Sequence, residues 1–93
     1  MAQFSRGETI ICSCEVKNSN GIYTDPQTSM KITITDFQNS DEVDDANMIW
    51  TSVGKYHYDW NTSVNNLKGI YTVLFKATDG TRITIKKETI DLR

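Results

Sequence analysis

Two cysteines at alternate positions are the first candidates for chemistry in this 93-residue chain. Cys12 and Cys14 form a Cys-x-Cys pair, a spacing that suggests a metal or redox site. On an extended strand, however, side chains at i and i+2 point the same way with Cα atoms roughly 6.5–7 Å apart, too far and too parallel for a good disulfide. A zinc site needs about two more ligands. The pair therefore predicts two small buried side chains, whose free thiols fit a reducing compartment.

The single histidine is the next candidate. His57 alternates with two tyrosines, so it faces solvent if those rings face the core, and Asp59 lies on the same side, two residues on. The two could form part of a nucleophilic triad. No serine or cysteine lies on a sharp glycine elbow nearby, and cross-strand charge pairing explains the histidine better. We predict no catalytic site, no cofactor and no enzymatic activity.

Acidic residues concentrate between residues 39 and 47. Asp41, Glu42, Asp44 and Asp45 have a composition that calcium-binding loops use, but their spacing does not match an EF-hand and the turn glycine is missing. The sequence predicts a solvated loop, with or without a turn of helix, and no metal site. A calcium site in this loop stays open as the alternative.

Aromatic residues recur at every second position after Gly54. Tyr56, Tyr58 and Trp60, together with Trp50, either fill a core or form a platform for sugars or single-stranded nucleic acid. A net charge of −2 and dispersed basic residues argue against nucleic acid, because such binding depends on Lys and Arg. We predict a core, and a carbohydrate platform remains an alternative if the tryptophans are exposed.

These residues need strands to position them. Turn signals divide the chain into extended segments at 2–6, 8–17, 29–36, 48–52, 55–60, 69–77 and 82–92, with no helical periodicity between them. In the last segment Ile83 and Ile85 share one phase and Ile90 and Leu92 the other, which predicts a bulge near 86–88. The predicted core is Ile10, Cys12, Cys14, Val16, Met30, Ile32, Ile34, Met48, Trp50, Tyr56, Tyr58, Trp60, Tyr71, Val73, Phe75, Ala77, Ile83, Ile85, Ile90 and Leu92.

The motif Leu67-Lys-Gly-Ile-Tyr71-Thr-Val73 resembles the start of strand F in immunoglobulin-like domains. In that family a tyrosine, matched here by Tyr71, bonds through its hydroxyl to the preceding corner. Val73 occupies the place of the family's second cysteine, so the inter-sheet disulfide cannot form. The resemblance implies an all-β, two-sheet immunoglobulin-like sandwich of about seven antiparallel strands, with residues 1–93 as a single domain.

A likeness covers nearly the whole chain. Its motifs are Gly7-Glu-Thr, Asn20-Gly, Asp25-Pro, Lys31-Ile-Thr-Ile, the tyrosine and tryptophan run, and Gly69-Ile-Tyr-Thr-Val-Leu-Phe-Lys-Ala-Thr-Asp-Gly. It is similar to small bacterial immunoglobulin-like modules, related to macroglobulin and fibronectin type III sandwiches, in surface proteins and tailed-phage structural proteins. The resemblance implies a structural protein of a phage or prophage virion, made in the host cytoplasm. The alternative is a spacer, adhesion or carbohydrate-binding module of a secreted or cell-surface protein.

The expected partners are proteins, either other copies or a larger assembly. Nothing approaches the roughly 20 apolar residues of a membrane span, and the first eight residues lack the pattern of a secretory signal. We expect no membrane, nucleic-acid or small-molecule partner. The candidate contact residues are apolar side chains in the outward phase or near turns: Ile11, Phe37, Ile49 and Leu74. Strands at the sheet edges are a second candidate contact.

Overall fold

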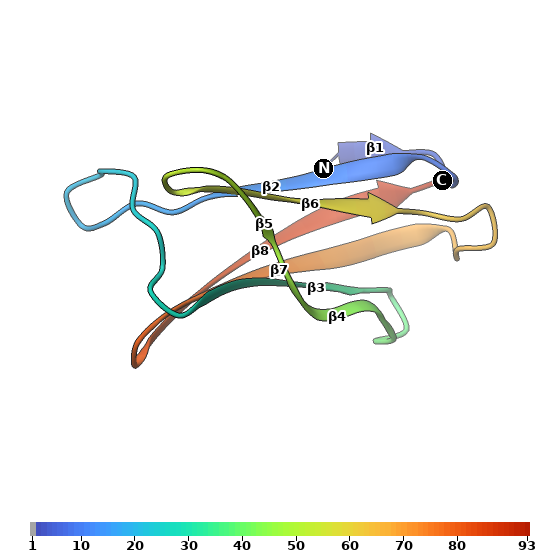
Figure 1. Cartoon of the computed structure of the whole chain (residues 1–93). Coiled ribbons are helices and arrows are strands. Elements are labelled where there is room, and N and C mark those ends of the chain that lie inside the picture. The colour runs from blue at the N-terminus through green and yellow to red at the C-terminus, as the bar shows by residue number, and fades with distance from the viewer. Residues whose placement is uncertain (1) are drawn as a thin grey trace.

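Two β-sheets face each other in the computed structural model, which describes residues 2–93 (Figure 1). The strands are β1 (Ala2–Phe4), β2 (Thr9–Glu15), β3 (Ser29–Thr35), β4 (Asp41–Asn47), β5 (Ile49–Ser52), β6 (Lys55–Asn61), β7 (Gly69–Asp79) and β8 (Arg82–Leu92). The order is β1-β8-β7-β3-β4 in one sheet and β2-β6-β5 in the other. The all-β, two-sheet prediction is confirmed. Met1, which bears on the secretory-signal expectation, lies outside the described residues.

Strict alternation along the central strands places the core between the sheets. Ile32 and Ile34 on β3 and Tyr71 and Phe75 on β7 are at most 2% exposed, and they face the β2 side chains across the interior. Trp60 of β6 packs on Tyr71 with ring centroids 5.1 Å apart and planes tilted by 56°, a geometry aromatic pairs prefer. Each such buried side chain contributes about 1.5–3 kcal/mol relative to exposure.

The hydrogen bond expected at Tyr71 is present. Its hydroxyl donates to the carbonyl oxygen of Leu67 at 2.7 Å, just before β7 begins at Gly69. The predicted Asp79-Gly80 hairpin is also confirmed, since Asp79 pairs with Arg82 across the turn.

The prediction of a loop at 39–47 is wrong, because Asp41–Asn47 is strand β4. A turn closed by the Asp36 carboxylate, which accepts hydrogen bonds from the amides of Gln38 and Ser40 at 2.8 and 2.9 Å, brings β4 back against β3. Val43 pairs with Ile34 and is buried, and half-buried Ala46 packs against the core, so two apolar side chains anchor an otherwise acidic edge strand. The charged residues obscured this strand in the sequence.

Two further details of the strands differ from the expectation. The sheets contain eight strands among residues 2–93, where about seven were predicted, and β1 runs parallel to β8, with Ala2 opposite Ile90. The predicted bulge at 86–88 is absent, because β7 and β8 pair without a register shift from Gly69↔Leu92 to Asp79↔Arg82. Ile83 and Ile85 therefore lie on the outer face, 60% and 54% exposed, and not in the core.

Trp50 is also outside the core, with 55% of its surface exposed. It lies on the short edge strand β5, where all four residues are exposed and the pairing with β6 shifts register after Trp50. Val16, Tyr56, Tyr58 and Ala77 are half-buried and pack against the core. The other predicted core residues are buried.

Candidate functional site

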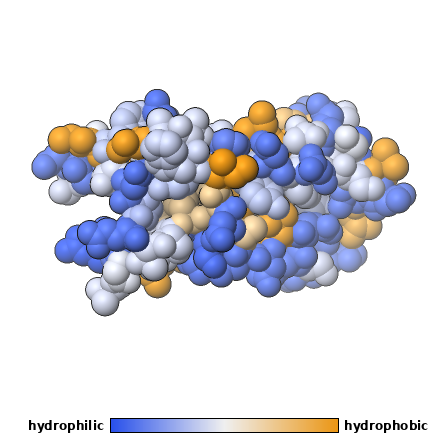
Figure 2. Space-filling view, viewed as in Figure 1, coloured by the Kyte–Doolittle hydropathy of each residue, from blue (hydrophilic) through white to orange (hydrophobic). Residues whose placement is uncertain are grey.

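A hollowed region of the surface lies between the edges of the two sheets, where β2 and β8 diverge. Three hollows of ≈ 480, ≈ 400 and ≈ 120 Å³ succeed one another along this side. Cys14 and Lys86 line both larger hollows, and Ser13 links the second to the third. Figure 2 shows the surface hollowed at the end where the sheets separate. We call this feature the β2–β8 groove.

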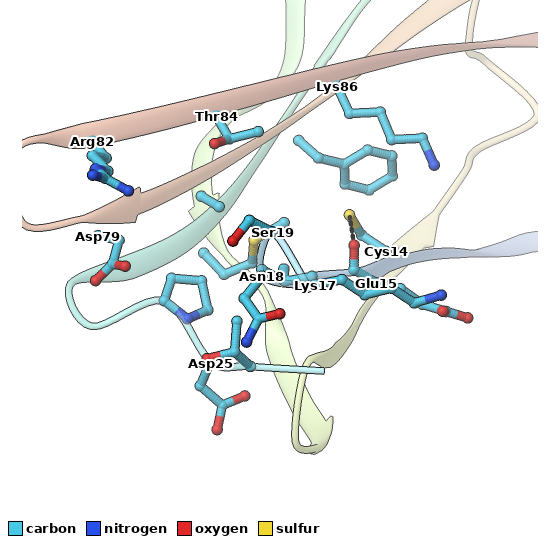
Figure 3. A pocket seen from close by; sticks show the side chains of 16 residues that line it. Cys14, Glu15, Lys17, Asn18, Ser19, Asp25, Asp79, Arg82, Thr84 and Lys86 are labelled. Atoms are coloured by element: carbon cyan, nitrogen blue, oxygen red, sulfur yellow. Dashed lines mark hydrogen bonds between the residues drawn. The ribbon is translucent and has the colours of Figure 1, made fainter. Parts of the chain in front are cut away.

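The β2–β8 groove has an apolar floor and a charged rim. Met30, Phe75 and Ala77 contribute apolar surface from the five-stranded sheet. Figure 3 shows Lys86 and Cys14 on one side of the largest hollow, with Asp79 and Arg82 at its other end. Side chains of both signs of charge line the groove, so its field favours neither a cation nor an anion.

The cysteine side chains in this region are thiols held in their neutral form. Cys12 and Cys14 are free and buried, as predicted. Burial raises the pKa of Cys12 to about 11, and burial also raises the pKa of Cys14, whose Sγ donates to the carbonyl oxygen of Glu15 at 3.8 Å. Because the thiolate is the nucleophile and the metal ligand, these positions oppose both kinds of chemistry near neutral pH.

His57 lies on the outer face of the three-stranded sheet, opposite Ser13 on one neighbour and Ile49 on the other. Its Nδ1 is 2.6 Å from the Thr51 hydroxyl oxygen. The Thr51 hydroxyl therefore occupies one of the two imidazole nitrogens. The contact joins two side chains of the β5–β6 hairpin, and neither of them lines any of the three hollows described above.

The acidic residues of β4 do not gather around one point. Within residues 2–93, no three His, Cys, Asp or Glu side chains are grouped as a metal site would require. Asp41 accepts a hydrogen bond from the Thr35 hydroxyl at 2.9 Å, and Asp45 lies 3.2 Å from Lys76 Nζ and 3.7 Å from Lys31 Nζ. Alternation along a strand separates the carboxylates, and two of them are engaged with their own sheet.

Trp50 belongs to a polar cluster centred on the Asp25 carboxylate. That carboxylate accepts hydrogen bonds from Trp50 Nε1 at 3.2 Å, the Gly54 amide at 2.8 Å and the Tyr56 hydroxyl at 3.2 Å. The cluster fastens the segment after β2 to the β5–β6 hairpin. More than half of the Trp50 surface stays exposed there, and exposure of the tryptophans was the condition for the carbohydrate alternative.

The four candidate contact residues do not form one patch. Ile11 and Ile49 lie on the outer face of the three-stranded sheet, on strands separated by β6. Leu74 is half-buried on the opposite face of the molecule, between Thr33 and Lys87, and exposed Phe37 packs at the rim beside Gly69. Apolar side chains are likewise scattered among polar ones in Figure 2. Their role as contacts stays a prediction.

Sequence reasoning named sheet edges as candidate contacts but did not identify the edge of β8 as one of them. All eight residues from Arg82 to Thr89 are exposed, in both phases of the strand, and within residues 2–93 β1 covers β8 only from Ile90 to Leu92. The sequence feature that could have revealed it is the change of alternation between Ile85 and Ile90, which was attributed to a bulge. Without a bulge, the same pattern indicates two isoleucines facing out of the sheet.

Comparison of the chain with protein-family models, with curated proteins and with solved structures returns no match. The functional assignment therefore depends on the chain's own residues and their geometry.

Proposed function

We propose that this chain is a non-enzymatic assembly module with an immunoglobulin-like fold, and that it is a structural protein of a tailed-phage or prophage virion. The strand order supports the fold proposal. In immunoglobulin-like sandwiches the seventh, sixth and third strands lie together in one sheet and the second, fifth and fourth in the other. Counting β4 as an added strand, β8-β7-β3 and β2-β6-β5 follow this arrangement, and the Tyr71 bond matches the family's tyrosine corner.

The observation that carries the assembly function is the exposed edge of β8. An edge strand whose backbone groups and side chains are both open is a template for a strand of another chain. The groups capable of chemistry also support a non-enzymatic role, because the Cys12 thiol is neutral and His57 hydrogen-bonds to Thr51. Free thiols, and the resemblance of the sequence motifs to those of phage structural modules, support the virion setting.

Reconstitution tests this function. The chain is co-expressed with the proteins encoded by neighbouring genes, and the products are separated by size and imaged by electron microscopy. We expect the chain to comigrate with a particle or oligomer at fixed stoichiometry. A chain that stays free in every combination contradicts the proposal.

The exposure of Trp50 favours one second candidate, a carbohydrate-binding module of a secreted or cell-surface protein. Exposed indole faces stack on sugars, and the Asp25 carboxylate lies beside this one. Glycan-array binding that is lost in Trp50→Ala, and retained in the Ile49→Ala control from the same strand, would support this candidate over the virion.

A further inference from the structure

We propose that the edge of β8 pairs with the same edge of a second copy, antiparallel and with Ile85 opposite Ile85 of that copy. This inference rests on the assembly function proposed above and names its partner. The pairing would join two five-stranded sheets across a twofold axis.

The backbone of β8 has free hydrogen-bonding groups along this edge. Just after β8, the Arg93 amide donates to the carbonyl oxygen of Phe4 and the Arg93 carbonyl accepts from the Arg6 amide, both at 2.9 Å. Arg93 therefore directs both of its groups toward β1. Alternate residues of an antiparallel strand direct their groups to the same side, so Lys87, Ile85 and Ile83 present theirs to this edge as well. Among residues 2–93, no strand borders them there.

Residues whose side chains face the interior in one copy must lie opposite interior-facing residues of the second copy, because a shift by one residue would place every side chain opposite one on the other face. In the proposed register, Ile83 faces Lys87 and Ile85 faces its own copy on the outer side. These are the residues with free backbone groups, so they exchange about six hydrogen bonds. On the groove side, Arg82 faces Glu88 at both ends, and Thr84 faces Lys86.

The neighbouring registers are excluded by charge or space. Moving the axis to Thr84 places Arg82 opposite Lys86, and moving it to Lys86 places that residue opposite its own copy; like charges directly opposite are destabilising. The Lys86-centred register also sets Arg82 of the second copy against Ile90, where Ala2 of β1 already pairs. In the Ile85-centred register, the paired stretch runs from Arg82 to Glu88 in each copy. It therefore does not overlap Ile90, where Ala2 pairs.

Lysines on an edge strand ordinarily oppose pairing. In the proposed register, Lys86 and Lys87 lie opposite uncharged residues of the second copy. Lys87 lies opposite Ile83 of the second copy and can cover it with its methylene stem. Lys86 is held by Glu88 of its own strand at 3.2 Å and lies opposite a threonine. Self-complementarity of this kind favours a second copy over an unrelated peptide.

Charge reversal with rescue tests the register. The dissociation constant is measured by sedimentation velocity for the wild type, Arg82→Glu, Glu88→Arg and their equimolar mixture. We expect a concentration-dependent wild-type dimer, a dissociation constant raised about tenfold or more in each variant, and recovery in the mixture, where both opposed pairs are again Glu and Arg. Lys68 is an exposed residue before β7, and Lys68→Glu is the control that changes the charge by the same amount as Arg82→Glu. Circular dichroism and urea midpoints verify that each variant folds.

Three outcomes would overturn the inference. One is a wild-type chain that stays monomeric at the highest concentrations used for solution NMR. Another is a dimer that neither variant weakens, or that the mixture fails to restore. A chain that joins a larger particle as a monomer also overturns the second-copy inference, but it leaves the proposed assembly function standing.

Discussion

The Tyr71 hydroxyl donates a 2.7 Å hydrogen bond to the carbonyl oxygen of Leu67, four residues upstream. Tyr71 is fully buried against Trp60, so its phenol ties the entry of β7 to the centre of the core. This single contact links the turn between β6 and β7 to the packing of both sheets.

Tyr71→Phe should remove that bond while keeping the ring. We expect a loss of about 1–2 kcal/mol in the free energy of unfolding, because the carbonyl loses its donor in a partly buried site. Urea denaturation measures the loss. Tyr23→Phe removes an exposed hydroxyl that donates to Glu15 at 2.7 Å, and as the control it should change stability by less than about 0.5 kcal/mol. Equal losses in both variants would contradict this account.

Gly54 should be the least replaceable glycine of the hairpins. Its φ is +72°, and an added Cβ would lie 2.6 Å from the Val16 carbonyl oxygen and 2.8 Å from Tyr23 Cβ. We expect Gly54→Ala to cost more than about 2 kcal/mol, since both strain and a backbone clash act on it. Gly80→Ala, with φ +63° and open space around it, should cost only about 1 kcal/mol. Similar urea midpoints for the two variants would argue against the close approach at Gly54.

The buried Cys12 thiol predicts a loss of stability in alkali. Its pKa is raised from 9.0 to about 11, so above pH 9 the unfolded chain releases a proton that the folded chain retains. The contribution of the Cys12 thiol to the free energy of unfolding is fully present below pH 9. It is lost as the pH rises toward 11, and the loss is at most about 3 kcal/mol. Comparing urea unfolding of the wild type and Cys12→Ala at pH 8 and pH 10.5 isolates the effect. A pH dependence unchanged in the variant would refute it.

Asp45 should titrate below its ordinary value of 3.8, chiefly because Lys76 bonds to its carboxylate and Lys31 adds a second positive charge. Its lowered pKa stabilises the fold above pH 3.8, and this contribution is lost as the pH falls through the lowered pKa. Carbon-detected NMR titration should give a midpoint that rises in Lys76→Met. A midpoint that stays the same in that variant would show that the ion pair has no such effect.

The central strands could be predicted from sequence because alternation there coincides with burial on one face. β3 and β7 are bordered by strands on both sides. The apolar residues at every second position, such as Ile32 and Val73, therefore all lie on the buried face, as the alternation predicts. The edges could not be predicted in this way. Trp50 and Ile85 have the residue types of core positions, but their exposure depends on whether another strand or sheet covers them, which is a tertiary property.

The site was less accessible to sequence reasoning than the fold. Each of Ile11, Phe37, Ile49 and Leu74 was chosen by phase alone, and phase does not tell which faces and edges coincide in space. The edge of β8 emerged only from the sheet order and from the pairing of β1 with Ile90 to Leu92. Within residues 2–93, β1 pairs with β8 from Ile90 to Leu92, and no strand borders Ile83, Ile85 and Lys87 on that side.

Amide hydrogen exchange, resolved by residue on the free chain and on the assembled form, tests the assembly role of the β8 edge most directly. Dilute free chain should show rapid exchange at Ile83, Ile85 and Lys87 and slow exchange at Thr84 and Lys86, whose amides face β7. On assembly, the three fast amides should become protected. Fast exchange at all three in the assembled form, with new protection confined to the outer faces, would contradict the account.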